Sequence, residues 1–342
     1  MSKYNNIKVL DCTLRDGGHV NNADFGKKII SLIIDSLIKS RIDLIELGFL
    51  RNGVFTEDQT TSNTIQETES YIKIGNPKTD FSVMIRPDWY DIRQLTECTG
   101  KIRFIRFAFY YKDIDLTEKY TKYARDKGYK VILNPVNVMG YDEKTLIDLL
   151  KHINDIRPYG TTIVDTFGAL QQLDLMRIYN FYEKYISEDM TIGLHLHENM
   201  STSFSLAQYF LSVLNPNRSI IIDASLLGMG RIPGNLCIEI LLDFLNTNYS
   251  KNYDLLPILA AISSYIQPIK DKIPWGYSPA YYFTGKYAMH RSYAEYLLTK
   301  SDIDLSDIFI ILNEIKNSAY ASNYNEAYVK DVYTKYKSRL EK

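Results

Sequence analysis

The sequence predicts an α/β protein, a (β/α)₈ (TIM) barrel that carries a C-terminal helical extension. Eight short apolar runs alternate with longer stretches of helical periodicity, and this alternation is typical of parallel strands joined by helices. The chain has 342 residues, whereas a barrel of this kind commonly uses about 250. We therefore expect a barrel domain over residues 1–248 and a helical region over 249–342 that packs on it.

The eight strand candidates are short and almost continuously apolar. They cover residues 7–10, 44–50, 81–85, 104–110, 130–138, 162–164, 191–196 and 220–227. Strands of a parallel sheet have this composition because helices cover both of its faces.

Between the strands, apolar residues recur at helical spacing. In the segment 25–40, Ile30, Ile33, Ile34 and Leu37 share one face of a helix. Residues 141–156, 173–186 and 204–214 repeat the pattern. An open eight-stranded sheet is the alternative to a closed barrel, but no G-x-G-x-x-G motif follows the first strand, so a dinucleotide-binding sheet lacks its usual signature.

Beyond residue 248 the sequence predicts helices over 255–266, 303–315 and 319–342, with Pro268, Pro274 and Pro279 breaking the chain between the first two. The segment 275–287 is rich in tyrosine and would be costly to leave exposed as an apolar patch. We expect this region to cover the mouth of the barrel and to direct Tyr281 into it. A dimerisation arm on the outside of the barrel is the alternative.

The composition excludes several classes of function. The formal net charge is −1, which gives no electrostatic footprint for nucleic acid, and no apolar run is long enough to span a membrane. The three cysteines lie far apart and are expected to be reduced thiols. We therefore expect a soluble cytoplasmic protein.

Reactive residues gather where the first strand ends, in the sequence D-C-T-L-R-D-G-G-H from Asp11 to His19. An arginine, a carboxylate, two glycines and a histidine occupy five positions, and the glycines allow the backbone to curl so that the side chains converge. A surface turn with an Arg–Asp ion pair is the alternative interpretation of this segment.

The seventh strand ends in G-L-H-L-H-E-N, which places His195 and His197 two residues apart. Alternate residues of a strand share a face, so both imidazoles are expected to point into the barrel. Such a pair is a natural set of metal ligands, whereas two buried histidines satisfied by carbonyl groups are the structural alternative.

The eighth strand is followed by G-M-G-R-I-P-G-N, from Gly228 to Asn235. Glycine-rich turns after the last strands of a barrel often present backbone N–H groups to anions. Asn235 is equally well explained as a helix N-cap.

Together, these three segments resemble the DRE-TIM metallolyases over residues 7–247. This superfamily includes 4-hydroxy-2-oxovalerate aldolase, 3-hydroxy-3-methylglutaryl-CoA lyase, and the isopropylmalate and citramalate synthases. The motifs that carry this resemblance are D-x-T-L-R-D-G, H-x-H and G-x-G-x-x-x-G-N. Within the superfamily the aldolase branch is the most similar, because His19, H-L-H-E-N-M-S and V-D-T-F-G-A-L resemble its pattern. The glycine loop has no cysteine before Cys237, unlike that of the hydroxymethylglutaryl-CoA lyases.

The resemblance implies a divalent metal, Mn²⁺ or Mg²⁺, held by Asp16, His195 and His197, with Asn235 as a further ligand. One carboxylate and two imidazoles make Mn²⁺ a compromise between hard and soft ligands.

The resemblance also implies three catalytic residues. Arg15 would stabilise an enolate oxygen, His19 would be the general base, and Tyr281 would line the pocket. Residues assigned to substrate binding are Thr166, Arg51 and Glu46. Arg51 stands where the aldolases have a different sequence, H-G-D-G. It would either meet an acidic substrate group or remain a solvated surface residue.

The implied function is retro-aldol cleavage or aldol addition of a 4-hydroxy-2-oxo acid, giving or using pyruvate and an aldehyde through a metal-bound enolate. Claisen-type condensation of an acyl-CoA with a 2-oxo acid is the alternative, and a catalytically inactive barrel is the third. Expected partners are the small-molecule 2-oxo acid and aldehyde, with an aldehyde dehydrogenase or a second copy of the chain as protein partners.

Overall fold

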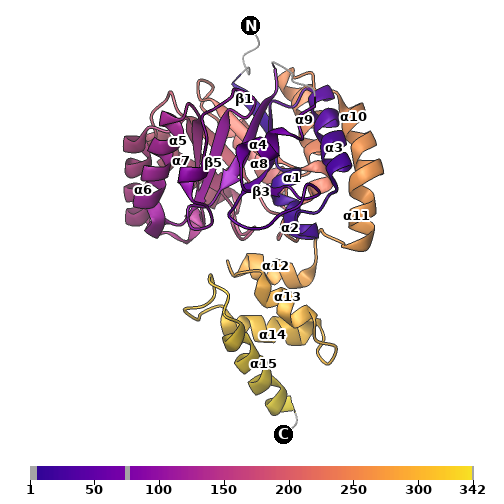
Figure 1. Ribbon diagram of the computed structural model, residues 1–342. Helices are drawn as coiled ribbons and strands as arrows, with labels where there is room; N and C mark the ends of the chain where they lie inside the picture. Colours follow the sequence, from indigo (N-terminus) through magenta and orange to yellow (C-terminus); the bar gives the residue numbers. More distant parts are fainter. Residues whose placement is uncertain (1–5, 74–77, 341–342) are drawn as a thin grey trace.

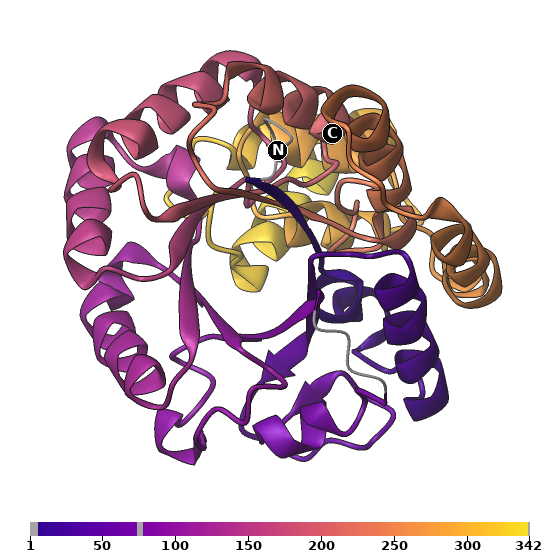
Figure 2. The same ribbon diagram turned by 90° about the horizontal axis from the view of Figure 1, so that it is seen from above.

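In the computed structural model, which describes residues 6–73 and 78–340, a closed barrel of parallel strands forms the body of the molecule (Figures 1 and 2). The barrel strands are β1 (Ile7–Asp11), β2 (Leu44–Leu50), β4 (Asp80–Ile85), β5 (Phe104–Phe109), β6 (Lys130–Pro135), β7 (Gly160–Val164), β8 (Thr191–His195) and β9 (Ile220–Ala224). β1 pairs in parallel with both β9 and β2, so the sheet closes on itself. A further short strand, β3 (Thr61–Ser62), pairs with the end of β2.

All eight predicted barrel strands are confirmed, but two of them, β6 and β9, end three residues earlier than predicted. β9 stops at Ala224 because the chain turns into a 3₁₀-helix, η4 (Leu226–Gly228), in which Leu227 and Gly228 have φ of 53° and 63°. β6 stops at Pro135, and Asn137 then adopts φ of 61° at the start of η3 (Val138–Gly140). All three positive φ values are incompatible with a continuing strand.

Helices surround the barrel and cover its outer face (Figure 2). They are α3 (Lys27–Lys39), α4 (Ile65–Glu69), α5 (Ile114–Asp126), α6 (Glu143–Ile156), α7 (Gln172–Tyr185), α8 (Ser203–Val213) and α9 (Ile238–Tyr249). The connection from β4 to β5 holds only a 3₁₀-turn, η1 (Ile92–Gln94), and η2 (Tyr111–Asp113) precedes α5. The carboxyl end of β1 leads into two single-turn helices, α1 (Thr13–Asp16) and α2 (Gly18–Asn21).

The interior of the barrel is built in layers that follow from the two-residue period of a strand. The layer nearer the amino ends of the strands is apolar and contains residues from five strands: Leu10, Leu44, Phe104, Ile132 and Ile221. Two residues further along four of these strands, the same inner face carries polar side chains, which are Glu46, Arg106, Asn134 and Asp223. The barrel is therefore closed by an apolar plug with a buried polar layer next to it, toward the carboxyl ends of the strands.

The C-terminal helices fall into two groups. α10 (Leu255–Ala261), the π-helical turn η5 (Ile262–Ile266) and α11 (Gln267–Lys272) share the hydrophobic core of the barrel, to which Ile258 and Ile266 belong. A second hydrophobic cluster is formed by α12 (Pro279–Lys286), α13 (Ser292–Leu298), α14 (Leu305–Ile315) and α15 (Glu326–Leu340). The boundary at residue 248 stays a prediction.

The predicted helix over 319–342 is wrong in its first part, and residues 341–342 lie outside the described part of the chain. α15 begins at Glu326 because the side chain of Asn325 accepts a hydrogen bond of 2.9 Å from the Tyr328 backbone N–H, as an N-cap does.

The helices α12 to α15 lie at the end of the barrel where α1 and α2 follow β1 (Figure 1). This is the end formed by the carboxyl termini of the strands, where barrel enzymes hold their active sites. Among the described residues, no helix is long and apolar enough to cross a membrane.

α12 approaches the barrel closely at Gly285, where an added Cβ would lie 2.8 Å from the Asn199 Cβ and 3.0 Å from the Gly168 carbonyl oxygen. We predict that Gly285→Val lowers the free energy of unfolding by about 1–3 kcal/mol through overpacking. Chemical denaturation measures this change. Lys286→Val, an exposed neighbour in the same helix, is the control, and an equal effect of both variants would contradict tight docking of α12.

Candidate active site

A cavity of about 350 Å³ opens at the carboxyl ends of the barrel strands. Its walls come from the loops after several strands, from the turn between α12 and α13, which contributes His290 and Arg291, and from Ser292 at the start of α13. The C-terminal region thus contributes to the lining of the cavity.

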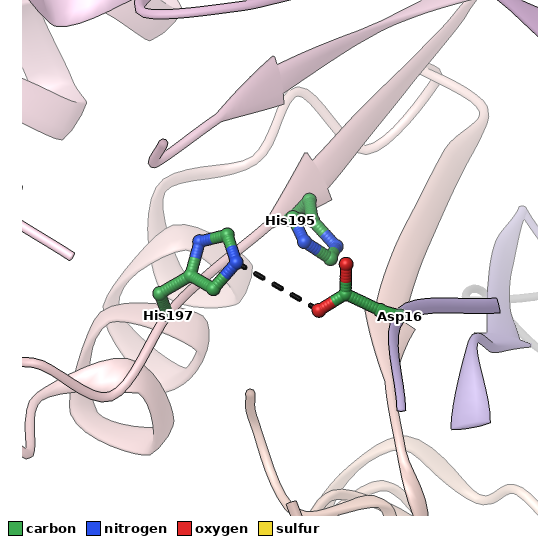
Figure 3. Close-up of side chains that lie close together, drawn as sticks. All are labelled: Asp16, His195 and His197. Atoms are coloured by element: carbon green, nitrogen blue, oxygen red, sulfur yellow. Dashed lines mark ion pairs between the residues drawn. The ribbon is translucent and has the colours of Figure 1, made fainter. Parts of the chain in front are cut away.

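Asp16, His195 and His197 line this cavity and converge on one point (Figure 3). One ligand atom from each lies within 4.8 Å of the other two, and all three side chains are buried. Asp16 ends α1, His195 ends β8 and His197 follows it, so the neighbouring positions of β1, β9 and β8 in the barrel bring them together.

The His195 ring is oriented by Asp223. Its Nδ1 lies 3.1 Å from the Asp223 Oδ2, and a carboxylate can only accept, so Nδ1 carries a proton and Nε2 is the ring nitrogen left to contact a ligand. Burial disfavours the charged form of Asp223, but Arg106 and His195 outweigh it and lower the pKa of this carboxyl group.

The His197 ring is oriented by the backbone. Its Nδ1 donates to the Asp165 carbonyl oxygen at 2.7 Å, which leaves the lone pair on Nε2. This Nε2 is buried, lies 3.8 Å from the Asp16 Oδ2, and has no hydrogen-bond partner within the described residues. Burial and the adjacent His195 lower the pKa of His197 to about 3, so the ring is neutral and suited to a metal.

Asp16 supplies the negative charge of the group. Burial opposes its ionisation, but the guanidinium of Arg15 and the two imidazoles hold its pKa well below the usual range. Its Oδ2 accepts hydrogen bonds from the Arg231 backbone N–H at 3.1 Å and from the Asn235 Nδ2 at 2.9 Å. A buried carboxylate beside two imidazoles whose Nδ1 atoms are engaged elsewhere is a donor set that fits a divalent cation.

Asn235 lies beside these residues and orients Asp16 through its amide nitrogen. Its Oδ1, the atom that a metal would require, is buried without a hydrogen-bond partner in the described part of the chain.

The polar layer of the barrel connects Asp16 to His195 from below. Arg15 donates from Nη1 to Asp16 and from Nε to the Glu46 Oε2 at 2.6 Å. Arg106 donates to the same Glu46 oxygen at 3.1 Å and to the Asp223 Oδ2 at 2.5 Å. Asp223 then holds His195. Acidic and basic side chains alternate along this chain, and all of them are buried.

His19 and Thr166 also line the cavity. The His19 Nε2 lies 4.0 Å from the Asp16 Oδ1, and about a third of the His19 side chain (35%) is exposed. Desolvation by the cavity walls, together with Arg231 and Arg15, lowers the pKa of His19 to about 4, although Asp16 acts in the opposite direction. The Thr166 hydroxyl oxygen accepts from the Asn137 backbone N–H at 2.6 Å, so its proton is available to a ligand.

Besides Asn235, three of the expected site residues do not line the cavity. Tyr281 is buried in the hydrophobic cluster of the C-terminal helices. Glu46 lies one layer below, in the middle of β2, where it holds Arg15 and Arg106. Arg51 is exposed, and its guanidinium stacks at 4.8 Å on Trp89, which itself lines the wall.

Four residues of the site were not predicted from the sequence, namely Asp223, Trp89, Arg231 and Arg291. Asp223 had a usable signal, because an acid within the apolar run I-I-I-D-A must have a buried partner. The other three lie in loops, and their place at the cavity depends on how those loops fold.

Comparison with known proteins agrees with this geometry. The HMGL-like family model matches residues 6–264. A 4-hydroxy-2-oxovalerate aldolase of Carboxydothermus hydrogenoformans is 23% identical over 327 residues, which cover 91% of this chain and 92% of the relative. An oxaloacetate decarboxylase of Mycobacterium tuberculosis is 23% identical over 234 residues, 68% of each chain.

This chain belongs to the HMGL-like family. It is an enzyme of the carbon–carbon lyase type within the DRE-TIM superfamily. Among solved structures, the N-terminal domain of a candidate aldolase from Bacteroides vulgatus superposes with a TM-score of 0.73 at 25% identity and covers 86% of this chain and 97% of that one. The hydroxymethylglutaryl-CoA lyase of Pseudomonas aeruginosa shares the fold, with a TM-score of 0.62 at 14% identity over 88% of this chain and 99% of that one.

The buried charges below the cavity generate a stability prediction. Arg106→Met would leave Glu46 and Asp223 without the cation between them, and we expect a loss of about 3–5 kcal/mol in the free energy of unfolding. Arg103→Met is the control, because Arg103 pairs with Asp80 on the surface, where such a pair contributes about 0–1 kcal/mol. Equal losses of unfolding free energy in both variants would show that the buried polar layer is no more sensitive to loss of a cation than a surface ion pair is.

Proposed function

We propose that this enzyme is a divalent-metal-dependent aldolase that cleaves a 4-hydroxy-2-oxo acid to pyruvate and an aldehyde, or joins the two. The observation that carries the proposal is the convergence of Asp16, His195 and His197 in a cavity that Arg15 and His19 also line.

The donor set supports a divalent cation at this point. Both rings leave Nε2 available to a ligand because their Nδ1 atoms are engaged, and the Asp16 carboxylate is ionised. One hard oxygen ligand and two imidazoles suit Mn²⁺, with Mg²⁺ as the alternative. When bound, the cation would supply Lewis-acid polarisation of the 2-oxo group.

Arg15 provides fixed positive charge beside this group. Its guanidinium is held by Asp16 and Glu46, and these neighbours raise the pKa of Arg15 further despite its burial. A preorganised cation at the site where an oxyanion develops lowers the barrier because it need not reorient during the reaction.

His19 is placed to accept the proton of the 4-hydroxyl group. With its pKa lowered to about 4, the ring is neutral at physiological pH. As the proton leaves, the bond between C3 and C4 breaks, the C4 carbon becomes the aldehyde, and the electron pair remains on the pyruvate enolate, which is then protonated at C3. Thr166 would donate its hydroxyl proton to the substrate.

A screen of 4-hydroxy-2-oxo acids with added Mn²⁺ or Mg²⁺, read by product mass, tests the proposal. We expect pyruvate and an aldehyde. Release of free thiol from an acyl-CoA together with a 2-oxo acid would identify a condensing enzyme instead, and no turnover of either substrate class would contradict both activities.

We predict that His197→Gln lowers the amount of Mn²⁺ bound per chain and abolishes turnover, because the amide cannot present the ring Nε2 at the same place. Metal analysis after gel filtration measures the first effect. His152→Gln is the control, since this histidine is paired with Glu118 on a surface helix. Undiminished Mn²⁺ in His197→Gln would remove this residue from the metal site.

We further predict that Arg15→Ala lowers kcat by roughly 10²–10³ while the metal content is retained. Asp16 would still be positioned by Asn235 and by the Arg231 backbone N–H, so the ligand set survives the substitution. Steady-state kinetics and metal analysis of the same preparation measure both quantities. A variant with nearly normal kcat would exclude Arg15 from the chemical step.

A further inference from the structure

The cavity is strongly basic. Asp16 is the only carboxylate among its lining residues, in the part of the chain that the structure describes. Five guanidinium groups face the same space, from Arg15, Arg86, Arg106, Arg231 and Arg291.

The two deepest arginines are neutralised within the barrel. Arg15 and Arg106 share Glu46, and they are bound in addition by Asp16 and Asp223, respectively. The positive charges of these two arginines are therefore balanced by carboxylates of the buried polar layer.

Two arginines at the mouth are also paired with a carboxylate of a neighbouring residue. Arg86 contacts Asp88 at 3.0 and 2.7 Å, and Arg291 contacts Glu295 at 2.6 Å. In Arg291, however, Nε is buried and has no hydrogen-bond partner among the described residues.

Arg231 differs from the other four. Within the described residues, the Arg231 guanidinium makes one side-chain hydrogen bond, from Nη2 to the His290 Nε2 at 2.9 Å. Because a guanidinium can only donate, the His290 ring accepts and is neutral. Burial, with Arg231 and Arg291 nearby, lowers the pKa of His290 to about 4, so this partner offers no negative charge.

A half-buried cation without an anionic partner is unfavourable until an anion binds. Arg231 and Arg291 also line a second, smaller cavity together with Thr166 and His197, so both reach the vicinity of the metal site. We call Arg231, His290 and Arg291 the basic wall.

The position of the basic wall defines which end of a substrate it meets. The Arg231 backbone N–H binds the Asp16 Oδ2, whereas its guanidinium reaches the C-terminal region at His290. One arginine thus spans the distance between the proposed metal ligands and the outer wall. A 2-oxo acid held at Asp16, His195 and His197 would extend its far end toward this wall.

We propose that the basic wall binds an anionic group on the aldehyde part of the substrate, so that the preferred aldehyde is short and carries a carboxylate or a phosphate. This inference rests on the proposed aldolase function. The acidic end of the 2-oxo acid is a separate requirement, because that end lies beside Arg15 and the metal ligands.

Aldol addition of pyruvate with Mn²⁺ tests the inference with matched aldehydes. Butanal is compared with succinic semialdehyde, and glyceraldehyde with glyceraldehyde 3-phosphate. The variants are Arg231→Met, which keeps an unbranched apolar side chain but removes the guanidinium and its charge, and Arg157→Met, an exposed control whose arginine pairs with Asp189. Calorimetric titration of the enzyme with succinate and with glycerol 3-phosphate, in the presence of Mn²⁺ and pyruvate, gives a readout that needs no turnover.

We expect kcat/KM to favour a charged aldehyde over its neutral counterpart, and Arg231→Met to reduce this ratio by roughly ten- to hundredfold, as loss of a charge-assisted hydrogen bond would. Preference for succinic semialdehyde would assign a carboxylate, and preference for glyceraldehyde 3-phosphate a phosphate. Equal use of charged and neutral aldehydes, with the same ratio in Arg231→Met, would overturn the inference.

The calorimetric arm separates this inference from the proposed function. If no aldehyde is turned over, the aldolase proposal fails, but anion binding that is weakened at least tenfold in Arg231→Met and unchanged in Arg157→Met still supports the basic wall. Equal affinity in the wild type and both variants would contradict it.

Discussion

The site depends on one buried chain of alternating charges, from Asp16 through Arg15, Glu46, Arg106 and Asp223 to His195. Isolated buried charges are strongly unfavourable, and each member is tolerated only because its neighbours have the opposite sign. Three carboxylates and two guanidiniums leave one net negative charge at the end of the barrel. A divalent cation beside Asp16 would reverse that sign and attract an anionic substrate.

The two-residue period of the strands explains where this chain lies. Leu44, Phe104, Ile132 and Ile221 seal the barrel, and the next inward positions carry the polar layer. The loops then add the groups that face the substrate. The layers therefore differ in what they do, since the first excludes water, the second orients the proposed metal ligands, and the third contacts the ligand. The C-terminal turn with His290 and Arg291 completes the third layer.

Features with a strong local signal could be predicted from the sequence. The apolar runs located the barrel strands, and H-L-H placed two imidazoles on one face. Features set by long-range packing could not. α5 was missed because three of its four buried residues are the small Thr117, Thr121 and Ala124, and only Ile114 is a large apolar side chain. Arg51 is a surface residue, the second of its two expected roles. The register of β2 shifts between Glu46 and Phe49, where Gly48 has φ of 143° and its space is filled by the Thr60 backbone. The position of Tyr281 could not be predicted because it depends on how α12 is oriented against its neighbours.

Enolate formation at this site is the central claim, and hydrogen exchange of the pyruvate methyl group measures it without knowledge of the aldehyde. Pyruvate is incubated with the enzyme and Mn²⁺ in D₂O and followed by proton NMR. The account predicts loss of the methyl signal at a rate that requires both the enzyme and Mn²⁺, and that returns to background with a chelator. A methyl signal that stays unchanged while the protein binds Mn²⁺ and pyruvate would contradict it.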